Sequence, residues 1–203
     1  MFEIELKARV HDRRAVLERL DSFAEYTGSV EKRDVYYSAP PGCCGRDGAP
    51  HPSVRLRRQT VRQDGICTDT SFFTYKRKEV RTGDGAATEV NDERECAVSD
   101  PEPIAAFLEG IGFSPSLQKR KIVESYRVAT ARGTASLELC GVPPLGDFLE
   151  VEILSVSDAP DVVTAVQAEV RALLARCGVA LEDVEPRYYS ELLAEAGADG
   201  CGG

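Results

Sequence analysis

The stretch FEIELKAR, from Phe2 to Arg9, decides the fold because its apolar and charged residues alternate without interruption. Successive side chains of a β-strand point to opposite faces of the sheet, so this alternation predicts a strand with one apolar and one charged face. Glu3, Glu5 and Lys7 share the charged face. The apolar face predicts a sheet packed on a core. The role of the charged face is interpreted from the charged residues of the strands that follow.

Further strands are predicted along most of the chain, with few helices between them. Alternating or β-rich segments occupy residues 35–37, 54–57, 72–80, 92–98, 119–128, 134–140 and 148–154. Amphipathic helices are predicted from Asp12 to near Gly28, over residues 101–110 and 159–177, and from Pro186 through Leu193. Residues 63–65 suit a turn, whereas residues 38–53 and 81–88 have the composition of loops.

About eight strands with so few helices predict an α+β fold, a mostly antiparallel eight-stranded β-barrel with helices packed outside. We expect a single domain over residues 1–197, followed by a disordered glycine-rich tail at residues 198–203. The apolar stripe of the helix at residues 159–177 suits either the outside of the barrel or a homodimer contact.

The composition narrows the classes of function. No apolar run reaches the length of a membrane span and the chain does not start like a signal peptide, so we expect a cytoplasmic protein that does not contact membranes. The net charge of -9 argues against general binding to nucleic acid. Basic residues nevertheless cluster, because residues 1–80 carry 15 Lys and Arg against 12 Asp and Glu, while residues 81–203 carry 10 against 22.

Like-charged residues two positions apart recur on the strands. Such pairs share a face and repel each other unless opposite charges lie between them. The pairs are Glu3 and Glu5, Arg55 and Arg57, Lys76 and Lys78, Glu93 and Glu95, Lys119 and Lys121, and Glu150 and Glu152. They could form the solvated face of an ordinary antiparallel sheet. Alternatively, a closed barrel would turn them inward, where cations bind phosphate oxygens and carboxylates hold Mg2+ or Mn2+ that bridges to the phosphates.

Together these motifs resemble the CYTH group of the triphosphate tunnel metalloenzymes, which takes in class IV adenylyl cyclases and thiamine triphosphatases. Glu3-x-Glu5-x-Lys7 is similar to the N-terminal signature of the group. Its basic strands are similar to Val54-Arg55-Leu56-Arg57, Thr74-Tyr75-Lys76 and Lys119-Arg120-Lys121. The segments Leu145–Glu152 and Tyr189–Leu193 resemble the cyclase-like branch. The resemblance spans nearly the whole chain and implies a tunnel-shaped barrel.

The resemblance also implies roles for the charged residues. The catalytic centre would consist of Lys7 and the metal-binding Glu3, Glu5, Glu150 and Glu152, with Mg2+ or Mn2+ as the cofactor. The triphosphate would be bound by Lys7, Arg55, Arg57, Lys76, Lys119 and Lys121. Arg120 ranks below these because alternation turns it away from its two neighbours, although a bulge would reverse that.

Cys140 departs from the family pattern, because an acidic residue is usual shortly before the segment that begins at Leu145. Glu138 has the same parity as Cys140 and could supply a metal-binding carboxylate through water. Alternatively, Cys140 could be a buried core thiol, which is the commoner role of a free cysteine.

Two reactions and one binding role fit the resemblance. The segment Leu145–Glu152 favours an adenylyl cyclase-like enzyme, in which the ribose 3'-hydroxyl of ATP attacks the α-phosphorus to give cyclic AMP and pyrophosphate. Hydrolysis of inorganic tripolyphosphate or thiamine triphosphate is the alternative, because a shared fold transfers site chemistry better than substrate identity. A module that binds triphosphate or polyphosphate without turnover is the third hypothesis, which the loss of an acid at Cys140 permits.

Overall fold

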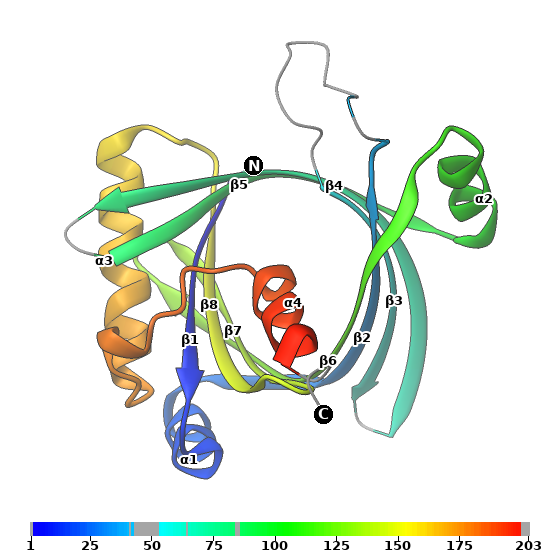
Figure 1. The fold of residues 1–203 in the computed structure, drawn as a ribbon. Helices are drawn as coiled ribbons and strands as arrows, with labels where there is room; N and C mark the ends of the chain where they lie inside the picture. The colour runs from blue at the N-terminus through cyan, green and yellow to red at the C-terminus, as the bar shows by residue number, and fades with distance from the viewer. Residues whose placement is uncertain (1, 41, 43–52, 64, 84–85, 200–203) are drawn as a thin grey trace.

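β1 (Phe2–Val10) pairs with a strand on each of its edges, which closes the sheet into a barrel (Figure 1). The computed structural model describes residues 2–40, 42, 53–63, 65–83 and 86–199. β8 (Gly146–Ser155) pairs along the whole of β1, whereas β5 (Ala86–Val98) pairs only with residues 2–5. The order around the barrel is β1-β5-β4-β3-β2-β6-β7-β8, which confirms the predicted eight-stranded α+β barrel.

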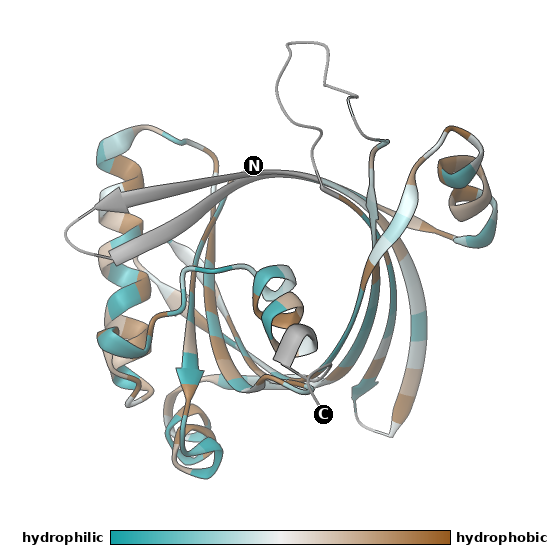
Figure 2. Cartoon of the chain, viewed as in Figure 1, coloured by the Kyte–Doolittle hydropathy of each residue, from teal (hydrophilic) through white to brown (hydrophobic). Residues whose placement is uncertain are grey.

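The other strands of the barrel are longer than the sequence patterns predict. They are β2 (Glu25–Ser38), β3 (Ser53–Gln63), β4 (Ile66–Gly83), β6 (Ser114–Thr130) and β7 (Gly133–Val142). All neighbouring strands pair in antiparallel orientation. Figure 2 shows hydrophilic and hydrophobic residues alternating along them, as expected when one face lines a lumen and the other meets helices or solvent.

Three helices cover the outer face of the barrel (Figure 1). α1 (Arg13–Phe23) and α3 (Pro160–Arg176) share the largest core cluster with outward-facing residues of β1, β7 and β8, such as Leu6, Leu137 and Val151. α2 (Glu102–Gly110) contributes Leu108 to a smaller cluster on β2 and β3. The apolar stripe of α3 is therefore buried against the barrel, which is the first of the two alternatives that the sequence left open.

α4 (Tyr189–Asp199) differs, because it lies within the ring of strands in Figure 1 instead of packing outside it. A short 3-10 helix (Leu181–Asp183) connects α3 to this last segment of the chain. Leu192 and Tyr189 belong to a core cluster whose other buried members are Val30, Val123, Cys140, Val142 and Phe148. Four of those residues lie two positions from a charged residue on the same strand, so they share its face of the sheet. α4 therefore packs on an apolar section of the inner face of the barrel, next to a charged section.

Several predicted boundaries were wrong. α1 ends at Phe23 instead of near Gly28, because Gly28 lies within β2 beside a register shift and has a φ of +128°. Residues 81–88 were predicted to be a loop, but β4 runs to Gly83 and β5 begins at Ala86. α4 begins at Tyr189 instead of Pro186 and ends at Asp199. Residues 43–52 and 200–203, which belong to the predicted loop and tail, lie outside the described part of the chain.

The helices in the described part of the chain lack the properties of a membrane span. None of them is both long enough and apolar enough to cross a bilayer.

Candidate functional site

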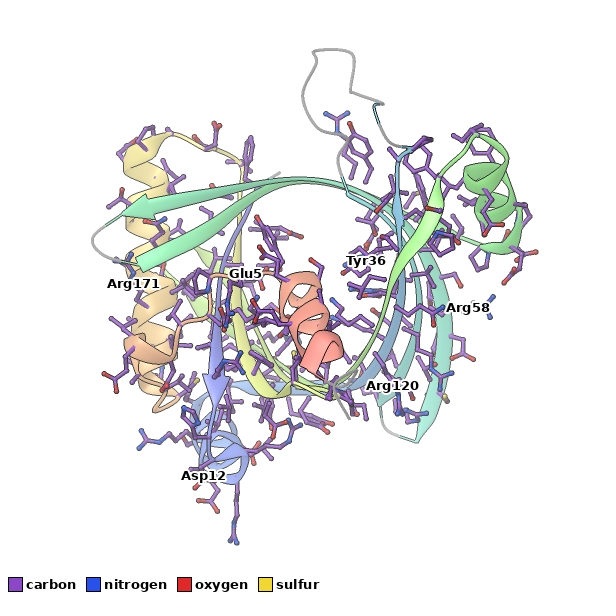
Figure 3. The ribbon with its side chains drawn as sticks, in the orientation of Figure 1. Glu5, Asp12, Tyr36, Arg58, Arg120 and Arg171 are labelled. Atoms are coloured by element: carbon purple, nitrogen blue, oxygen red, sulfur yellow. The ribbon has the colours of Figure 1, made fainter. Side chains whose placement is uncertain are left out.

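Carboxylates from three adjacent strands meet on the inner face of the barrel, which we call the lumen. The register places Glu5 of β1 opposite Glu152 of β8, and it places Glu150 of β8 between Lys7 of β1 and Glu138 of β7. Figure 3 shows Glu5 inside the ring of strands. Carboxylates directly opposite each other repel, so these strands require cations nearby.

Two lysines compensate the carboxylates of β7 and β8. Lys121 of β6 forms an ion pair with Glu150 and lies 3.5 Å from Oε2 of Glu138, while Lys32 of β2 binds the other oxygen of Glu138. Burial alone would raise the pKa of Glu150, but Lys121 outweighs it and holds that pKa well below its usual range. Lys32 and Lys121 likewise overcome burial and lower the pKa of Glu138. Both carboxylates are therefore ionised at neutral pH.

Asp34 of β2 holds two more basic side chains. It accepts hydrogen bonds from Nε of Arg57 at 2.7 Å and from Nη2 at 3.0 Å, and its Oδ2 lies 3.4 Å from Nζ of Lys119. Lys119 also donates to the phenol oxygen of Tyr36 at 3.0 Å. Burial would raise the pKa of Asp34, but hydrogen bonds from Arg57 and the charge of Lys119 lower it far below its ordinary value. Asp34 is therefore a buried anion between two cations.

Arg55 of β3 lies opposite Tyr36, and its side chain is 11% exposed. Its Nη2 donates to Oγ1 of Thr74 at 3.0 Å and to Oε2 of Glu95 at 3.1 Å. Thr74 donates to the same oxygen of Glu95 at 2.7 Å. The side chain of Glu95 is 34% exposed, whereas that of Lys121 is 5% exposed. The charged surface of the lumen thus extends from a buried lysine cluster to a partly solvated group of β3, β4 and β5.

Tyr189, the first residue of α4, packs against the lysines of the lumen. Nζ of Lys7, Lys119 and Lys121 lies 4.5, 4.9 and 5.6 Å from the centroid of the Tyr189 ring, within the range of cation–π contact. The ring also packs edge-on against Phe148, with the centroids 5.1 Å apart. Through Tyr189, α4 forms a wall of the charged lumen.

Most of the predicted site residues lie on this one surface, where Glu3 shares the inner face of β1 with Glu5. Arg120 does not, because its Nε donates to Glu31 at 2.9 Å on the outer face and its side chain is 52% exposed. The register on both sides of Arg120 is regular, so no bulge turns it inward. The predicted Lys76 is in β4, but its side chain lies outside the described part of the chain, as do those of Lys78 and Glu93.

The predicted site residues did not include Lys32, Asp34, Tyr36 or Tyr189, although each of these contacts the site. The first three have the same parity on β2, so the signal was present in the alternation. The pattern of like-charged pairs does not include them, because these positions of β2 hold one cation, one anion and one phenol. Tyr189 reaches the lumen from a helix, and no strand spacing predicts that contact.

A group of described side chains on β7 and β8 has the spacing of a metal site. Glu138, Cys140 and Glu150 bring their ligand atoms within 4.8 Å of one another. The two carboxylates already hold Lys32 and Lys121, and burial raises the pKa of the Cys140 thiol, which stays protonated and donates to the backbone oxygen of Glu138 at 3.4 Å. Cys140 is therefore a buried thiol, the second of the two alternatives.

Glu3, Glu5 and Glu152 supply a further group of carboxylates on the same inner face. Glu5 and Glu152 face each other across the two strands, and Glu3 lies two positions from Glu5 on the same face. Mg2+ and Mn2+ prefer such oxygen ligands, and a cation between opposed carboxylates would remove their repulsion. The residues present therefore fit a divalent cation.

A closed antiparallel barrel whose lumen combines buried cations with carboxylates belongs to a small class of proteins that enclose a charged tunnel. The CYTH domain model matches residues 1–189, so the chain belongs to the CYTH domain family. The family resemblance that the sequence motifs carry is thereby confirmed. No match was found among curated proteins.

Several solved structures are similar to this chain. The PH1819 protein of Pyrococcus horikoshii OT3 is 25% identical with a TM-score of 0.75, and the match covers 96% of this chain and 99% of that one. A candidate adenylate cyclase from Vibrio parahaemolyticus is 19% identical with a TM-score of 0.69 and coverage of 96% and 98%. HpAC1 from Hippeastrum, a candidate adenylyl cyclase described as having a dominant triphosphatase activity, is 15% identical with a TM-score of 0.61 and coverage of 97% and 95%. The last two share the fold with this chain.

Proposed function

We propose that the chain is a metal-dependent enzyme that acts on a triphosphate held in the lumen. The observation that carries this proposal is the convergence of cations from β1, β3 and β6 on one largely buried surface, beside the carboxylates of β1 and β8. A triphosphate is a short anion of high charge density. Charge-assisted hydrogen bonds to it are stronger in a lumen that excludes water than on an exposed surface.

The basic residues would divide the binding between them. Arg55 and Arg57 have planar guanidinium groups that suit bidentate contacts with phosphate oxygens, while Lys7, Lys119 and Lys121 supply point charges. Since Tyr189 contacts all three lysines, the phosphates would approach them from the side of the lumen that the ring leaves open.

The acidic residues would hold the cofactor. Glu3, Glu5 and Glu152 would bind Mg2+ or Mn2+, while Glu150 and Glu138 would orient Lys121 and Lys32 beside them. When bound, the ion offsets the charge that develops on the phosphoryl oxygens.

Two reactions fit this arrangement. In the cyclase-like reaction, which the segment Leu145–Glu152 favours, the ribose 3'-oxygen bonds to the α-phosphorus of ATP, the bond to the bridging oxygen breaks, and pyrophosphate leaves as the hydroxyl proton is released. In the alternative, water attacks a terminal phosphorus of tripolyphosphate or thiamine triphosphate and a phosphate is released. Both depend on in-line positioning and need no covalent intermediate with the protein.

Turnover of defined substrates tests the proposal. Purified protein with Mg2+ or Mn2+ is incubated with ATP, tripolyphosphate or thiamine triphosphate, and the products are separated by ion-exchange chromatography. Cyclic AMP with pyrophosphate identifies the cyclase-like reaction, and orthophosphate identifies hydrolysis. Tight binding without any product would identify a binding module instead, and the absence of both binding and turnover would reject the proposal.

Matched variants connect any activity to the lumen. Glu5→Gln should abolish metal-dependent turnover and Arg57→Ala should raise KM, because the first side chain faces Glu152 and the second lies in the lumen. Arg120→Ala is the control, since it also removes an arginine from the barrel but from the outer face. Equal effects of all three substitutions on turnover would show that the activity does not depend on the lumen.

A further inference from the structure

We propose that Asp34 is a positioning residue that presents Arg57 and Lys119 to the triphosphate. The role rests on the proposed function, because the lumen that binds the substrate is the same. A triphosphate is an anion, and Asp34 would act on it only through the two cations that it holds.

The register centres Asp34 between its two partners. On β2 it lies directly opposite Arg57 of β3 on one side and directly opposite Lys119 of β6 on the other. Its side chain is fully buried, and those of Arg57 and Lys119 are 12% and 6% exposed. Three neighbouring strands therefore bring their charges together at one level of the barrel.

The hydrogen bonds fix the orientation of the guanidinium group. Asp34 receives Nε and Nη2 of Arg57 on separate oxygens, which sets the plane of the group as well as its distance. A guanidinium group has more N–H donors than these two, so the remaining donors can serve a phosphate. The arginine would thus be held in its binding geometry before the substrate arrives.

Tyr36 supports the same arrangement from the next inward-facing position of β2. Its hydroxyl oxygen accepts from Nζ of Lys119 at 3.0 Å, and that Nζ lies 5.3 Å from the centroid of the ring. Figure 3 shows Tyr36 within the ring of strands. Asp34 and Tyr36 together fix an ammonium group that would otherwise retain the rotamer freedom of a long side chain.

A purely structural ion pair is the competing explanation, and the direction of the effect on binding separates the two. Asp34→Asn removes a negative charge from the lumen, so electrostatics alone predicts tighter binding of a triphosphate. A positioning role predicts weaker binding, because Arg57 and Lys119 lose their fixed orientation. Both explanations allow a loss of stability, so stability alone does not decide between them.

Glu31→Gln provides a matched control. Glu31 lies on the same strand and accepts from Arg33 and from Arg120 at 2.9 Å each, but it does so on the outer face of the barrel. The control therefore removes a carboxylate that binds two arginines, one of them on β6, without altering the lumen.

The experiment measures tripolyphosphate binding by calorimetry in Mg2+ and the kinetics of any triphosphate that wild type turns over. Asp34→Asn should raise Kd and KM at least about tenfold, as expected for disrupted hydrogen bonds to charged groups. kcat should change much less, because the variant loses about the same binding free energy in the ground state as in the transition state. Glu31→Gln should leave all three constants within about twofold of wild type.

Two further measurements support the comparison, and the first of them does not require Asp34→Asn to fold. Tyr36→Phe removes only a hydroxyl and should raise Kd about threefold, as expected for one lost hydrogen bond. The Nε–H resonance of Arg57 should be protected from solvent exchange in wild type and Glu31→Gln, and Asp34→Asn should lose this protection.

Unchanged or tighter binding by folded Asp34→Asn would overturn the proposal. If that variant does not fold, unchanged binding by Tyr36→Phe would do so. Failure of wild type to bind any triphosphate would instead reject the proposed function, and it would be recognised before the variants are compared.

Discussion

Tyr36 links the charges of the lumen to pH. Burial alone would raise the pKa of its phenol, but the positive charge of Lys119, with a smaller contribution from Arg55, lowers that pKa to about 8, and Asp34 acts in the opposite direction. The ordinary value is 10.0, so the folded protein binds this proton less tightly than the unfolded chain. The resulting stabilisation is absent well below pH 8, grows between pH 8 and pH 10, and is complete above pH 10.

Titration of the phenolate absorbance checks this assignment. Wild type should show one tyrosine that ionises near pH 8, and Tyr36→Phe should remove that step. Tyr26, whose pKa is raised to about 12 mainly by burial, should ionise at much higher pH. Denatured protein is the control, because all of its tyrosines should ionise near the ordinary value. Superimposable curves for wild type and Tyr36→Phe would contradict the assignment.

Neighbouring residues of β6 should respond differently to truncation. Lys121→Ala leaves Glu138 and Glu150 buried without one of their two lysines, so unfolding in urea should show a loss of about 3–5 kcal/mol, and triphosphate affinity should fall. Arg120→Ala removes an exposed ion pair and should change stability by less than about 1 kcal/mol, with unchanged affinity. A similar loss of affinity in both variants would show that the face of β6 was misassigned.

The residue-scale pattern explains what the sequence could predict of the site. Alternation is local, so it placed Lys119 and Lys121 on one face and Arg120 on the other without knowledge of the fold. The pairing of Lys121 with Glu150 joins β6 to β8 across β7, and it depends on two strand registers that no local pattern contains. The sequence therefore supplied most of the charges, whereas their partners required the structure.

At the scale of elements, Gly28 shows why boundaries were harder to predict than strands. Glycine favours both helix ends and β-bulges, and near residue 28 the sequence suggested the helix end. In the structure Gly28 has a φ of +128°, and an added Cβ would lie 3.0 Å from the backbone oxygen of Arg62. The apolar residues of α4, such as Leu192, likewise predict a buried face without indicating whether it packs outside the barrel or within it.

Gly28→Ala should therefore destabilise the protein by about 1–3 kcal/mol, the cost of strained backbone in a β-strand. Gly110→Ala is the control, because nothing lies within 4 Å of its added Cβ and its φ is not in the left-handed region. Urea unfolding of both variants measures the difference. Equal stability of the two variants would show that the bulge accommodates a side chain.

At the scale of the whole molecule, the lumen is compensated internally and is not simply a positive funnel. Lys32 and Lys121 face Glu138 and Glu150, and Asp34 is shared by Arg57 and Lys119. The chain as a whole carries a net charge of -9. A triphosphate that enters alone would meet carboxylates as well as cations. When it enters with a divalent cation, the phosphates can pair with the basic side chains and the divalent cation can pair with the carboxylates.

Thermal unfolding tests this mutual dependence. A ligand present at about a hundred times its Kd stabilises the folded state by about 2.7 kcal/mol. In a domain of this size that corresponds to a rise in Tm of roughly 5–10 °C. Mg2+ with tripolyphosphate should reach this range, and the rise should exceed the sum of the rises with each alone, because the carboxylates of Glu5 and Glu152 repel a bare polyanion.

In Glu5→Gln, the rise in Tm with Mg2+ and tripolyphosphate together should fall to the sum of the rises with each alone, because one of the two opposed carboxylates is lost. In Arg120→Ala, whose substitution lies on the outer face, the combined rise in Tm should still exceed that sum. An equal rise with tripolyphosphate in the presence of EDTA would show that the cations of the lumen hold the anion without metal, and it would remove the carboxylates of β1 and β8 from the binding step.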